Sequence, residues 1–529
     1  MLQRELHQSY KRYKQGNKQF DAIIIGSGIS AMTLGSVLSK EGKKVLLLEK
    51  HYTPGGFTHT FKRGEWEWDV GVHYLGGIDD ENSFLRKAYD FICESPIEFA
   101  DMGEVYDTVF FGTDKYEFLK GKEQYKKRLI EYFPGEEKKI EAYIKLIFSV
   151  QKKNVPYIVW KVIPAPIRFI LTPFLLKPFL KYASRSTNEV MEQLGVSPKL
   201  KSVLCSRFGD YGLAPKFSSF GIHALVDTHY MNGGFYPAGG SSVFFQKIAP
   251  VIVNAGGEIL VRAEVEKILH TGGKVQGVKM TDGKEFYAPW VISSAGIQVT
   301  YEVLLKDPEI LHQKFGGLKS SVAHFCLYIG LDGSAEELQL PRSNFWIFPS
   351  YDFEDKLSHF LSSKTTDGMA FISFPSAKDP GYALRHPGRS TIEVISFGNF
   401  DEVISWQDKP WQKRGNDYEV FKQQLSSKLE KLLYTYVPQV KGRVIYKELS
   451  TPLSTRHFAN YSRGEMYGLE HSPARFRNKN LRPDTHIKGF FLTGQDITSC
   501  GVTGGLMAGL LTANVILKKN IIKKIEKQL

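Results

Sequence analysis

The sequence predicts an α/β fold built on a Rossmann-like parallel sheet. Apolar residues 22–25 are typical of a buried strand and run directly into the turn G-S-G-I-S-A at residues 26–31. A helical stretch follows to about Glu41, and a second apolar strand over 45–48 ends at Glu49. A strand, a glycine turn, a helix and a second strand with an acidic end form the βαβ unit that binds dinucleotides. The chain has 529 residues, too many for one ordinary core, so two interleaved domains are expected.

Each residue type in this unit has a physical role. Gly26 allows the tight turn, Gly28 lets the backbone approach a pyrophosphate, and Ala31 keeps the helix close to the strand. The N-terminus of the helix faces the phosphates with its unpaired N–H groups. Glu49 comes 23 residues after Gly26, where an acidic side chain can bond both ribose hydroxyls. The predicted contacts of this unit are Gly26, Gly28, Ile29, Ser30, Ala31, Glu49 and Lys50.

A second glycine pair and the far end of the chain indicate which dinucleotide binds. Gly55 and Gly56 resemble the E-x5-G-G extension of two-dinucleotide-binding-domain flavoproteins, and this resemblance implies FAD rather than NAD. Residues 490–493 predict a short strand, followed by a glycine turn and a helix that begins near Val502. The N-terminus of that helix would stabilise the negative charge of a reduced flavin. Asp496, in the glycine turn, is expected to bond the ribityl chain or to lie near the pyrophosphate. The predicted contacts here are Gly55, Gly56, Gly494, Asp496, Val502 and Thr503.

The middle of the chain is expected to return to this cofactor-binding domain. A helix over 242–254, a strand over 258–260, two hairpin turns and a strand over 290–293 follow one another. Val265 is placed to meet the adenine through its backbone, and Ala295 and Gly296 end the last strand. No second G-x-G-x-x-G fingerprint is present, so a dedicated NADPH domain is not expected. The predicted division is a basic arm at 1–19, an FAD domain at 20–96, 231–319 and 441–517, an α+β substrate domain at 97–230 and 320–440, and a basic tail at 518–529.

The net charge of +13 calls for an anionic partner. No nucleic-acid motif accompanies the charge, so nucleic acid is not expected. Residues 155–182 are the most apolar stretch, yet five prolines and the cations Lys161, Arg168, Lys177 and Lys181 exclude an ordinary spanning helix. Such a broken, basic, aromatic segment is typical of one that lies in an anionic membrane interface, although short core helices are the alternative.

The cysteine pattern indicates the kind of cellular compartment and whether a metal site is expected. The four cysteines are scattered without a C-x-x-C pair, which predicts no metal site and suits a reducing compartment. Residues 1–16 lack the apolar core of a signal peptide. We therefore expect a peripheral protein at the cytoplasmic face of a membrane.

Three further runs identify a family resemblance. Residues 69–77 (D-V-G-V-H-Y-L-G-G), 374–380 (F-P-S-A-K-D-P) and 463–468 (R-G-E-M-Y-G), with the flavin segments, resemble retinol saturases and plant-type carotenoid isomerases. Phytoene desaturases are more distantly similar. The resemblance covers nearly the whole chain and implies FAD and a long apolar polyene in a tunnel reached from the membrane. The second and third runs favour the saturase side, and the N-terminus favours a bacterial-type member.

A saturase gives a hydride to a C=C bond and needs a proton for the neighbouring carbon. The candidate proton donors are His73, Tyr74, Glu465 and Tyr467. Structural roles are the alternative for each: a histidine near the ribityl chain, two tunnel walls, and a carboxylate paired with Arg463. Residues 345–348 (F-W-I-F) would line the tunnel, or form an ordinary buried strand.

Three functions remain open from the sequence. The first is net redox on a polyene, as a saturase or a desaturase, with an electron donor that the sequence does not identify. The second is flavin-assisted cis–trans isomerisation. The third is a non-catalytic prenyl or lipid carrier on the same fold, which the intact glycines, Glu49 and Asp496 argue against.

Overall fold

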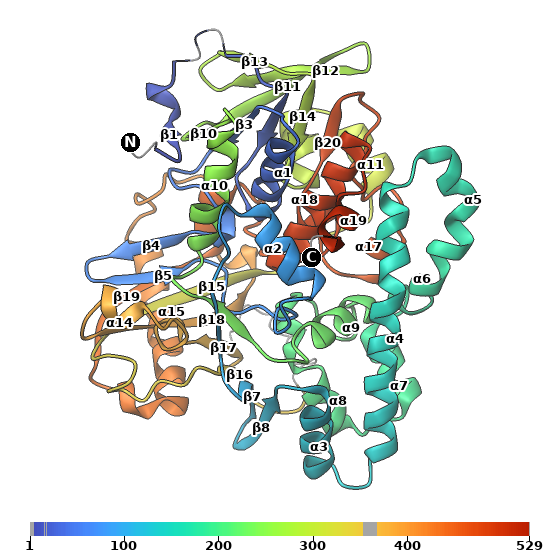
Figure 1. The fold of residues 1–529 in the computed structure, drawn as a ribbon. Coiled ribbons are helices and arrows are strands. Elements are labelled where there is room, and N and C mark those ends of the chain that lie inside the picture. The colour runs from blue at the N-terminus through green and yellow to red at the C-terminus, as the bar shows by residue number, and fades with distance from the viewer. Residues whose placement is uncertain (1–4, 15, 17, 353–367, 528–529) are drawn as a thin grey trace.

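The first half of the molecule, at the top of Figure 1, is a six-stranded parallel sheet with the elements that cover its two faces. Its strands come from both early and late parts of the chain. The computed structural model describes residues 5–14, 16, 18–352 and 368–527. The strands in order are β1 (Gln8–Ser9), β10 (Glu258–Val261), β3 (Val45–Glu49), β2 (Ala22–Ile25), β14 (Trp290–Ser293) and β20 (Phe490–Leu492). The central strands β2 and β3 are buried throughout, as their continuous apolar runs predict for a parallel sheet that is covered on both faces.

Helices cover one face of this sheet and a small antiparallel sheet covers the other. The helices are α1 (Ile29–Lys40), α10 (Val243–Asn254) and α18 (Gly501–Leu517), and the small sheet is β11 (Val265–Thr271), β12 (Lys274–Met280) and β13 (Glu285–Tyr287). Helices α1 and α18 approach each other closely at Gly505 and Gly509. A Cβ added at Gly509 would lie 2.6 Å from the carbonyl oxygen of Ser30, so only glycine fits there.

The second half contains a seven-stranded mixed sheet. Its order is β19 (Val444–Ser450), β15 (Ala323–Asp332), β18 (Arg389–Gly398), β17 (Ala370–Ser373), β16 (Asn344–Phe348), β7 (Val105–Phe111) and β8 (Asp114–Leu119). Helix α15 (Asn416–Tyr436) packs on one face. The other face is covered by a helical layer, at the lower right of Figure 1: α3 (Lys122–Tyr132), α4 (Glu137–Val162), α7 (Thr187–Leu194), α8 (Pro198–Leu204) and α9 (Phe220–His229).

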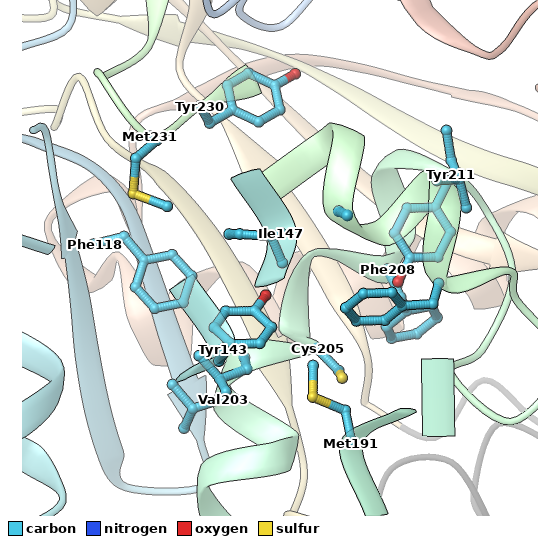
Figure 2. Packing of buried hydrophobic residues seen from close by; sticks show 14 of the residues in the cluster. Phe118, Tyr143, Ile147, Met191, Val203, Cys205, Phe208, Tyr211, Tyr230 and Met231 are labelled. Atoms are coloured by element: carbon cyan, nitrogen blue, oxygen red, sulfur yellow. The ribbon is translucent and has the colours of Figure 1, made fainter. Parts of the chain in front are cut away.

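The core between this sheet and its helices is rich in aromatic side chains. Figure 2 shows Phe118 of β8 beside Tyr143 and Ile147 of α4, with Phe208 of the short helix η3 (Ser206–Asp210) and Tyr230 in the same cluster. Strand β16 faces this cluster with Trp346 and Phe348, while Ile347 faces α15, because successive strand residues point to opposite faces. Residues 345–348 thus form a buried central strand, which was one of the two predicted roles.

The structure confirms most predicted elements of the cofactor-binding half and corrects the predicted division. The strands at 22–25 and 290–293 match β2 and β14 in full. Strand β19, assigned by the prediction to the FAD domain, pairs with β15 in the large sheet, so the boundary at 441 falls too early. This pairing joins residues more than 100 positions apart in the chain. No local pattern in the sequence predicts such a pairing.

The two chain ends are not free basic segments. Strand β1 of the predicted arm pairs with β10, and Tyr13 is buried. Helix α19 (Ile521–Glu526) of the predicted tail buries Ile521 and Ile525 against the α1 face. The ammonium groups of Lys519 and Lys524 both pair with Glu41, so part of the terminal charge is neutralised inside the protein.

The apolar segment 155–182 folds as helices. Helix α4 continues through Pro156, and α5 (Ala165–Leu175) and α6 (Lys177–Ala183) follow, at the right edge of Figure 1. Across the described part of the chain, no helix combines the length and the apolarity needed to cross a membrane.

Two of the four cations predicted for a membrane surface are buried. Lys161 Nζ donates to the carbonyl oxygens of Leu481 and Ile497, at 2.7 Å each, and Lys161 is 2% exposed. The Arg168 guanidinium lies over the Trp160 ring, 5.7 Å from its centroid, and Arg168 is 6% exposed. A cation inside a protein needs such partners, and those of Lys161 come from a distant part of the chain. Lys177 and Lys181 are exposed, as predicted.

Candidate active site

Two helix N-termini open onto unfilled space at the carboxyl edge of the parallel sheet. Gly28 caps α1, and a Cβ added there would meet no heavy atom within 4 Å. Gly501 begins α18 with φ 80°, and its added Cβ would also meet no atom within 4 Å. Gly56, with φ 56°, lies against Gly28, since its added Cβ would be 3.0 Å from the Gly28 Cα. Helix N-termini with free space in front suit anionic groups such as a pyrophosphate or a reduced flavin.

Glu49 holds the glycine turn together. Its Oε2 accepts hydrogen bonds from the backbone N and the Oγ of Ser27, at 2.9 and 2.6 Å, and its Oε1 accepts from His51 N at 2.8 Å. Gly55 N in turn donates to Ser27 Oγ at 2.9 Å, which joins the two glycine motifs. Burial raises the pKa of Glu49, against the effect of these hydrogen bonds. A ribose contact of Glu49 stays a prediction.

The residues beside Glu49 lie at the same edge of the sheet. Val261 of β10 pairs with Glu49, and the chain continues from Val261 to Val265 at the start of β11. Lys50 Nζ lies 3.0 Å from Glu264 Oε1 and donates to Asn460 Oδ1 at 3.2 Å. Val265 and Lys50 therefore lie at one edge of the sheet. The adenine contact of Val265 and the cofactor contact of Lys50 stay predictions.

The C-terminal segment is fastened to the first glycine turn. Ser30 Oγ lies 2.6 Å from Thr493 Oγ1 and accepts a hydrogen bond from Gly494 N at 2.9 Å. Ala31, one turn into α1, is fully buried, which keeps the helix against the sheet as predicted. Thr503 Oγ1 lies 3.3 Å from Tyr89 OH.

Asp496 braces the loops around the site. Its Oδ1 accepts from Leu469 N at 2.9 Å, and its Oδ2 accepts from Ile297 N at 2.8 Å. Gly296 packs beside it, since a Cβ there would lie 3.3 Å from Asp496 Oδ2. Ala295 N donates to Ser293 Oγ at 3.3 Å. The bonds described for Asp496 thus go to the backbone, and its predicted ribityl contact would use the remaining lone pairs of the carboxylate.

The four predicted proton donors have different hydrogen-bonding surroundings. His73 Nδ1 lies 3.0 Å from Glu393 Oε2, and burial, with the charge of Lys378, lowers the His73 pKa to about 3. Glu465 Oε2 accepts from the backbone N of Arg463 at 2.9 Å, and burial raises the Glu465 pKa. The Glu465 carboxylate therefore holds the backbone of Arg463, not its side chain. His73 is neutral at neutral pH, and this makes it a poor acid there.

A buried lysine stands behind His73. Lys378, from the F-P-S-A-K-D-P run, is 2% exposed and donates to the His73 carbonyl oxygen at 2.9 Å, to Ser373 Oγ at 2.8 Å and to Asn344 Oδ1. Burial lowers the Lys378 pKa to about 7 and raises the Glu393 pKa to about 8. Lys378 thus positions the His73 backbone through one hydrogen bond.

Tyr74 and Tyr467 lie on either side of Asp210. Tyr74 OH is 3.0 Å from Asp210 Oδ2 and 3.2 Å from Asp107 Oδ2, and the Tyr74 ring stacks on Tyr230 with the centroids 4.1 Å apart. Tyr467 OH donates to the carbonyl oxygen of Gly209 at 3.1 Å. Of the four predicted donors, these two are brought together.

The sequence analysis missed the acids of this network. Asp107 and Asp210 lie near a buried ion pair, in which Arg207 donates to Asp227 Oδ1 at 2.8 Å and both residues are 1% exposed. Arg207 also donates to Tyr106 OH at 3.0 Å. The available signal was the presence of charged residues at 207 and 210 inside an otherwise apolar stretch.

The parallel sheet, the two open helix N-termini and the braced C-terminal turn fit a flavin dinucleotide. They define the protein as a flavin-dependent oxidoreductase of mixed α/β fold, with a buried polar network beside the cofactor edge.

Comparison with known proteins agrees and gives the family. The model of the flavin containing amine oxidoreductase family matches residues 27–517, and the chain belongs to that family. The chain is 36% identical over 528 residues to the all-trans-retinol 13,14-reductase of Danio rerio, which covers 95% of this chain and 87% of that protein. It is 25% identical over 460 residues to prolycopene isomerase 1, chloroplastic, of an Oncidium hybrid cultivar, over 83% of this chain and 74% of that protein.

A solved structure shows the same fold. The oxidoreductase from Methanosarcina mazei superposes with a TM-score of 0.62 at 16% identity, over 94% of this chain and 100% of that one. The predicted fold class and the resemblance to the retinol saturase group are thereby confirmed.

Proposed function

We propose that the protein binds FAD and reduces one C=C bond of a long apolar polyene. The similarity to an all-trans-retinol 13,14-reductase over 95% of the chain supports this reaction class. The observation that carries the proposal is the junction of the two halves. The open N-terminus of α18 meets the aromatic half where Cys500 Sγ donates to the carbonyl oxygen of Asp210 at 3.3 Å.

The chain's own groups account for binding, orientation and proton supply. When bound, the flavin supplies a centre that gives or takes a hydride. Gly28 and Gly56 leave room for the pyrophosphate, and the N-terminus of α18 favours negative charge at the opposite end of the cofactor. The aromatic side chains of the second half offer an apolar environment for a polyene, and Tyr74, Asp107 and Asp210 can hold a proton beside it.

The second candidate is a flavin-assisted cis–trans isomerase, which the similarity to a prolycopene isomerase favours. The experiment is anaerobic incubation of the photoreduced, FAD-loaded protein with a panel of polyenes, followed by mass and isomer analysis. We expect one polyene to gain two hydrogens while the flavin reoxidises. Unchanged mass with a new isomer would replace the saturase with the isomerase, and tight binding without either change would favour a lipid carrier.

We also propose that the protein contacts an anionic membrane peripherally through α5. The exposed apolar side chains gather on this helix: Phe169 is 85% exposed, Phe174 72%, Ile170 68% and Ile167 52%. Lys177 and Lys181 follow on the next helix and are exposed. Apolar side chains with flanking cations suit the interface of an anionic bilayer, where each basic group contributes about 1 kcal/mol. The free thiols of Cys93, Cys326 and Cys500 suit the cytoplasmic face.

Liposome sedimentation tests this contact with substitutions that spare the buried cations. Replacing Phe169, Ile170 and Phe174 by serine should release the protein from vesicles rich in phosphatidylserine, while its FAD content stays unchanged. Replacing Lys177 and Lys181 by glutamine should weaken binding by about 2 kcal/mol at low salt. The matched control is Leu384→Ser, which removes a side chain that is 86% exposed elsewhere on the surface. Binding that survives the serine substitutions would place the contact elsewhere.

A further inference from the structure

A tyrosine hydroxyl bridges two aspartates at the seam of the two halves. Tyr74 OH lies 3.0 Å from Asp210 Oδ2 and 3.2 Å from Asp107 Oδ2. A tyrosine hydroxyl carries one proton, so it can donate to only one of the two carboxyl groups. The other carboxyl group can complete this bridge only by donating a proton of its own to the tyrosine oxygen. The geometry therefore calls for one protonated aspartate.

The surroundings favour Asp107 as the ionised partner. Asp107 is fully buried and its Oδ1 accepts a hydrogen bond from Asn344 Nδ2 at 3.1 Å, in addition to the bond from Tyr74. Burial raises the Asp107 pKa to about 6, and the nearby guanidinium of Arg207 limits this rise. Burial and the charge of Asp107 raise the Asp210 pKa to about 8. The order of the two values agrees with a protonated Asp210 at neutral pH.

Asp210 is also the most accessible member of the bridge. Tyr74 is 6% exposed and Asp107 is fully buried, whereas Asp210 is partly exposed. Its neighbours Tyr467 and Cys500 are partly exposed as well, and Cys500 caps the N-terminus of α18. Asp210 thus lies next to the N-terminus of α18, where Cys500 Sγ donates to its carbonyl oxygen at 3.3 Å.

We propose that Asp210 is the proton donor of the polyene reduction, and that Tyr74 and Asp107 hold it in place. In the balanced step, one carbon of the C=C bond would receive a hydride, with its electron pair, from the reduced flavin that the site would hold. The Asp210 O–H bond breaks and its proton goes to the neighbouring carbon, which leaves the oxidised flavin, the Asp210 carboxylate and a substrate with two more hydrogens. A proton from water then restores the acid. This inference rests on the proposed function.

Several titratable groups face Asp210 and enter its pH dependence. They are Asp107 on β7, Tyr74 after β5 (Trp66–Asp69), Arg207 on η3, Asp227 on α9, and Tyr230, Tyr467 and Cys500. Arg207 and Asp227 pair with each other, and the tyrosine and cysteine groups are neutral because burial raises their pKa values. Asp107 and Asp210 are therefore the groups of this set that titrate between about pH 6 and 8.

The first test is single-turnover reoxidation of the photoreduced protein by the polyene that the panel identifies. Asp210→Asn should slow reoxidation by on the order of 100- to 10,000-fold, as expected when a general acid is lost. Its flavin content and photoreduction should be unchanged. The wild-type rate should fall as the pH rises through about 8, and this fall should be absent in the variant. The matched control is Asp484→Asn, since Asp484 is another partly buried acid with a raised pKa, paired with Arg482.

The second test does not depend on turnover. The infrared difference spectrum between the oxidised, flavin-loaded wild type and Asp210→Asn should contain the C=O band of a protonated carboxyl group, which disappears as the pH rises through about 8. Glu393, whose pKa is also about 8, is present in both proteins and cancels in this difference. The difference spectrum between wild type and Asp484→Asn should lack this pH-dependent band. If Asp210→Asn does not fold, Tyr74→Phe replaces it, and the band should shift because the hydrogen-bond partner is lost.

The two tests separate the possible failures. Wild-type reoxidation rates in Asp210→Asn, or a difference spectrum between wild type and Asp210→Asn without a C=O band, would overturn the role of Asp210 alone. If no polyene reoxidises the wild-type flavin, the proposed function fails, and the infrared band still shows whether Asp210 is protonated. A pH-independent wild-type rate would also contradict the inference.

Discussion

The two halves of this molecule place their polar groups in different ways. In the parallel-sheet half, the buried carboxylates Glu49 and Asp496 bond to backbone N–H groups of nearby turns. In the second half, buried carboxyl groups bond to other side chains, as Asp107 does to Tyr74 and Asn344. A carboxylate that accepts backbone hydrogen bonds fixes the turns that donate them, and so shapes the space for a ligand. A group held by other titratable side chains can exchange protons, and this is what a proton-consuming reaction on the substrate requires.

The largest expected effect is the loss of flavin from the first half of the molecule. Gly28→Val should yield folded protein without flavin, with the dissociation constant for FAD raised by on the order of 100-fold or more, because the side chain fills the space in front of α1. Flavin titration measures the constant. Gly42→Val, at the other end of α1, is the control: it strains a residue with φ 77° but should keep the flavin. Equal flavin loss in both variants would mean that stability, not space, decides retention.

The sequence predicts the first half well because its signals are local. The strand at 22–25, the glycine turn and Glu49 lie within one βαβ unit, and each residue's role follows from its neighbours in the chain. The second half depends on distant pairs. Tyr74 meets Asp107 and Asp210 across 33 and 136 residues, and no periodicity records such a contact.

Dependence on distant residues also explains why two buried cations were wrongly predicted to be exposed. Lys161 and Arg168 were predicted to be exposed because they lie in a proline-broken, basic and aromatic segment. Both contact residues more than 300 positions away: Lys161 meets Leu481 and Ile497, and Arg168 lies 3.7 Å from Asp484. A single sequence shows that a charge is present and not what covers it.

The second expected effect is a loss of stability when the buried Arg207–Asp227 ion pair of the second half is disrupted. Asp227→Ala leaves Arg207 buried without its carboxylate partner and should lower the free energy of unfolding by about 3–5 kcal/mol. Denaturant unfolding of the flavin-loaded protein measures this change. Replacing both residues by apolar ones, Arg207→Met with Asp227→Leu, should recover most of the loss.

The control for this pair is an exposed one. Asp101 pairs with Lys120 at 2.6 Å, and their side chains are 44% and 41% exposed. Asp101→Ala should change the free energy of unfolding by about 1 kcal/mol at most. A loss at Asp227 as small as this would show that the buried ion pair does not organise the second half.

The smallest expected effect is a modest loss of stability at the close contact between α1 and α18 in the first half. Gly509→Ala places a methyl group 2.6 Å from the Ser30 carbonyl oxygen and should lower the free energy of unfolding by about 1–3 kcal/mol. Flavin should dissociate faster, because Ser30 also fastens the C-terminal turn. Stopped-flow release of flavin and thermal unfolding measure both effects.

Gly35 of α1 provides the comparison for Gly509 of α18. Gly35→Ala would meet the Cδ1 of Ile252 at 2.9 Å, and this methyl group can move away. The cost there should therefore be smaller than at Gly509, with unchanged flavin release. Equal losses at both positions would argue against a rigid contact between α1 and α18.

The order of strands in the parallel sheet has a consequence for synthesis in the cell. Strand β14 lies between β2, near residue 25, and β20, near residue 490, and α18 follows β20. The flavin site thus needs groups from residues 22–49 and from residues 490–517, and both segments must leave the ribosome before the site can close. Loop closure over such distances slows folding and leaves apolar strands exposed during translation. We therefore expect flavin to be captured only after α18 has left the ribosome, so that the supply of flavin and of chaperones during expression governs the yield of active protein.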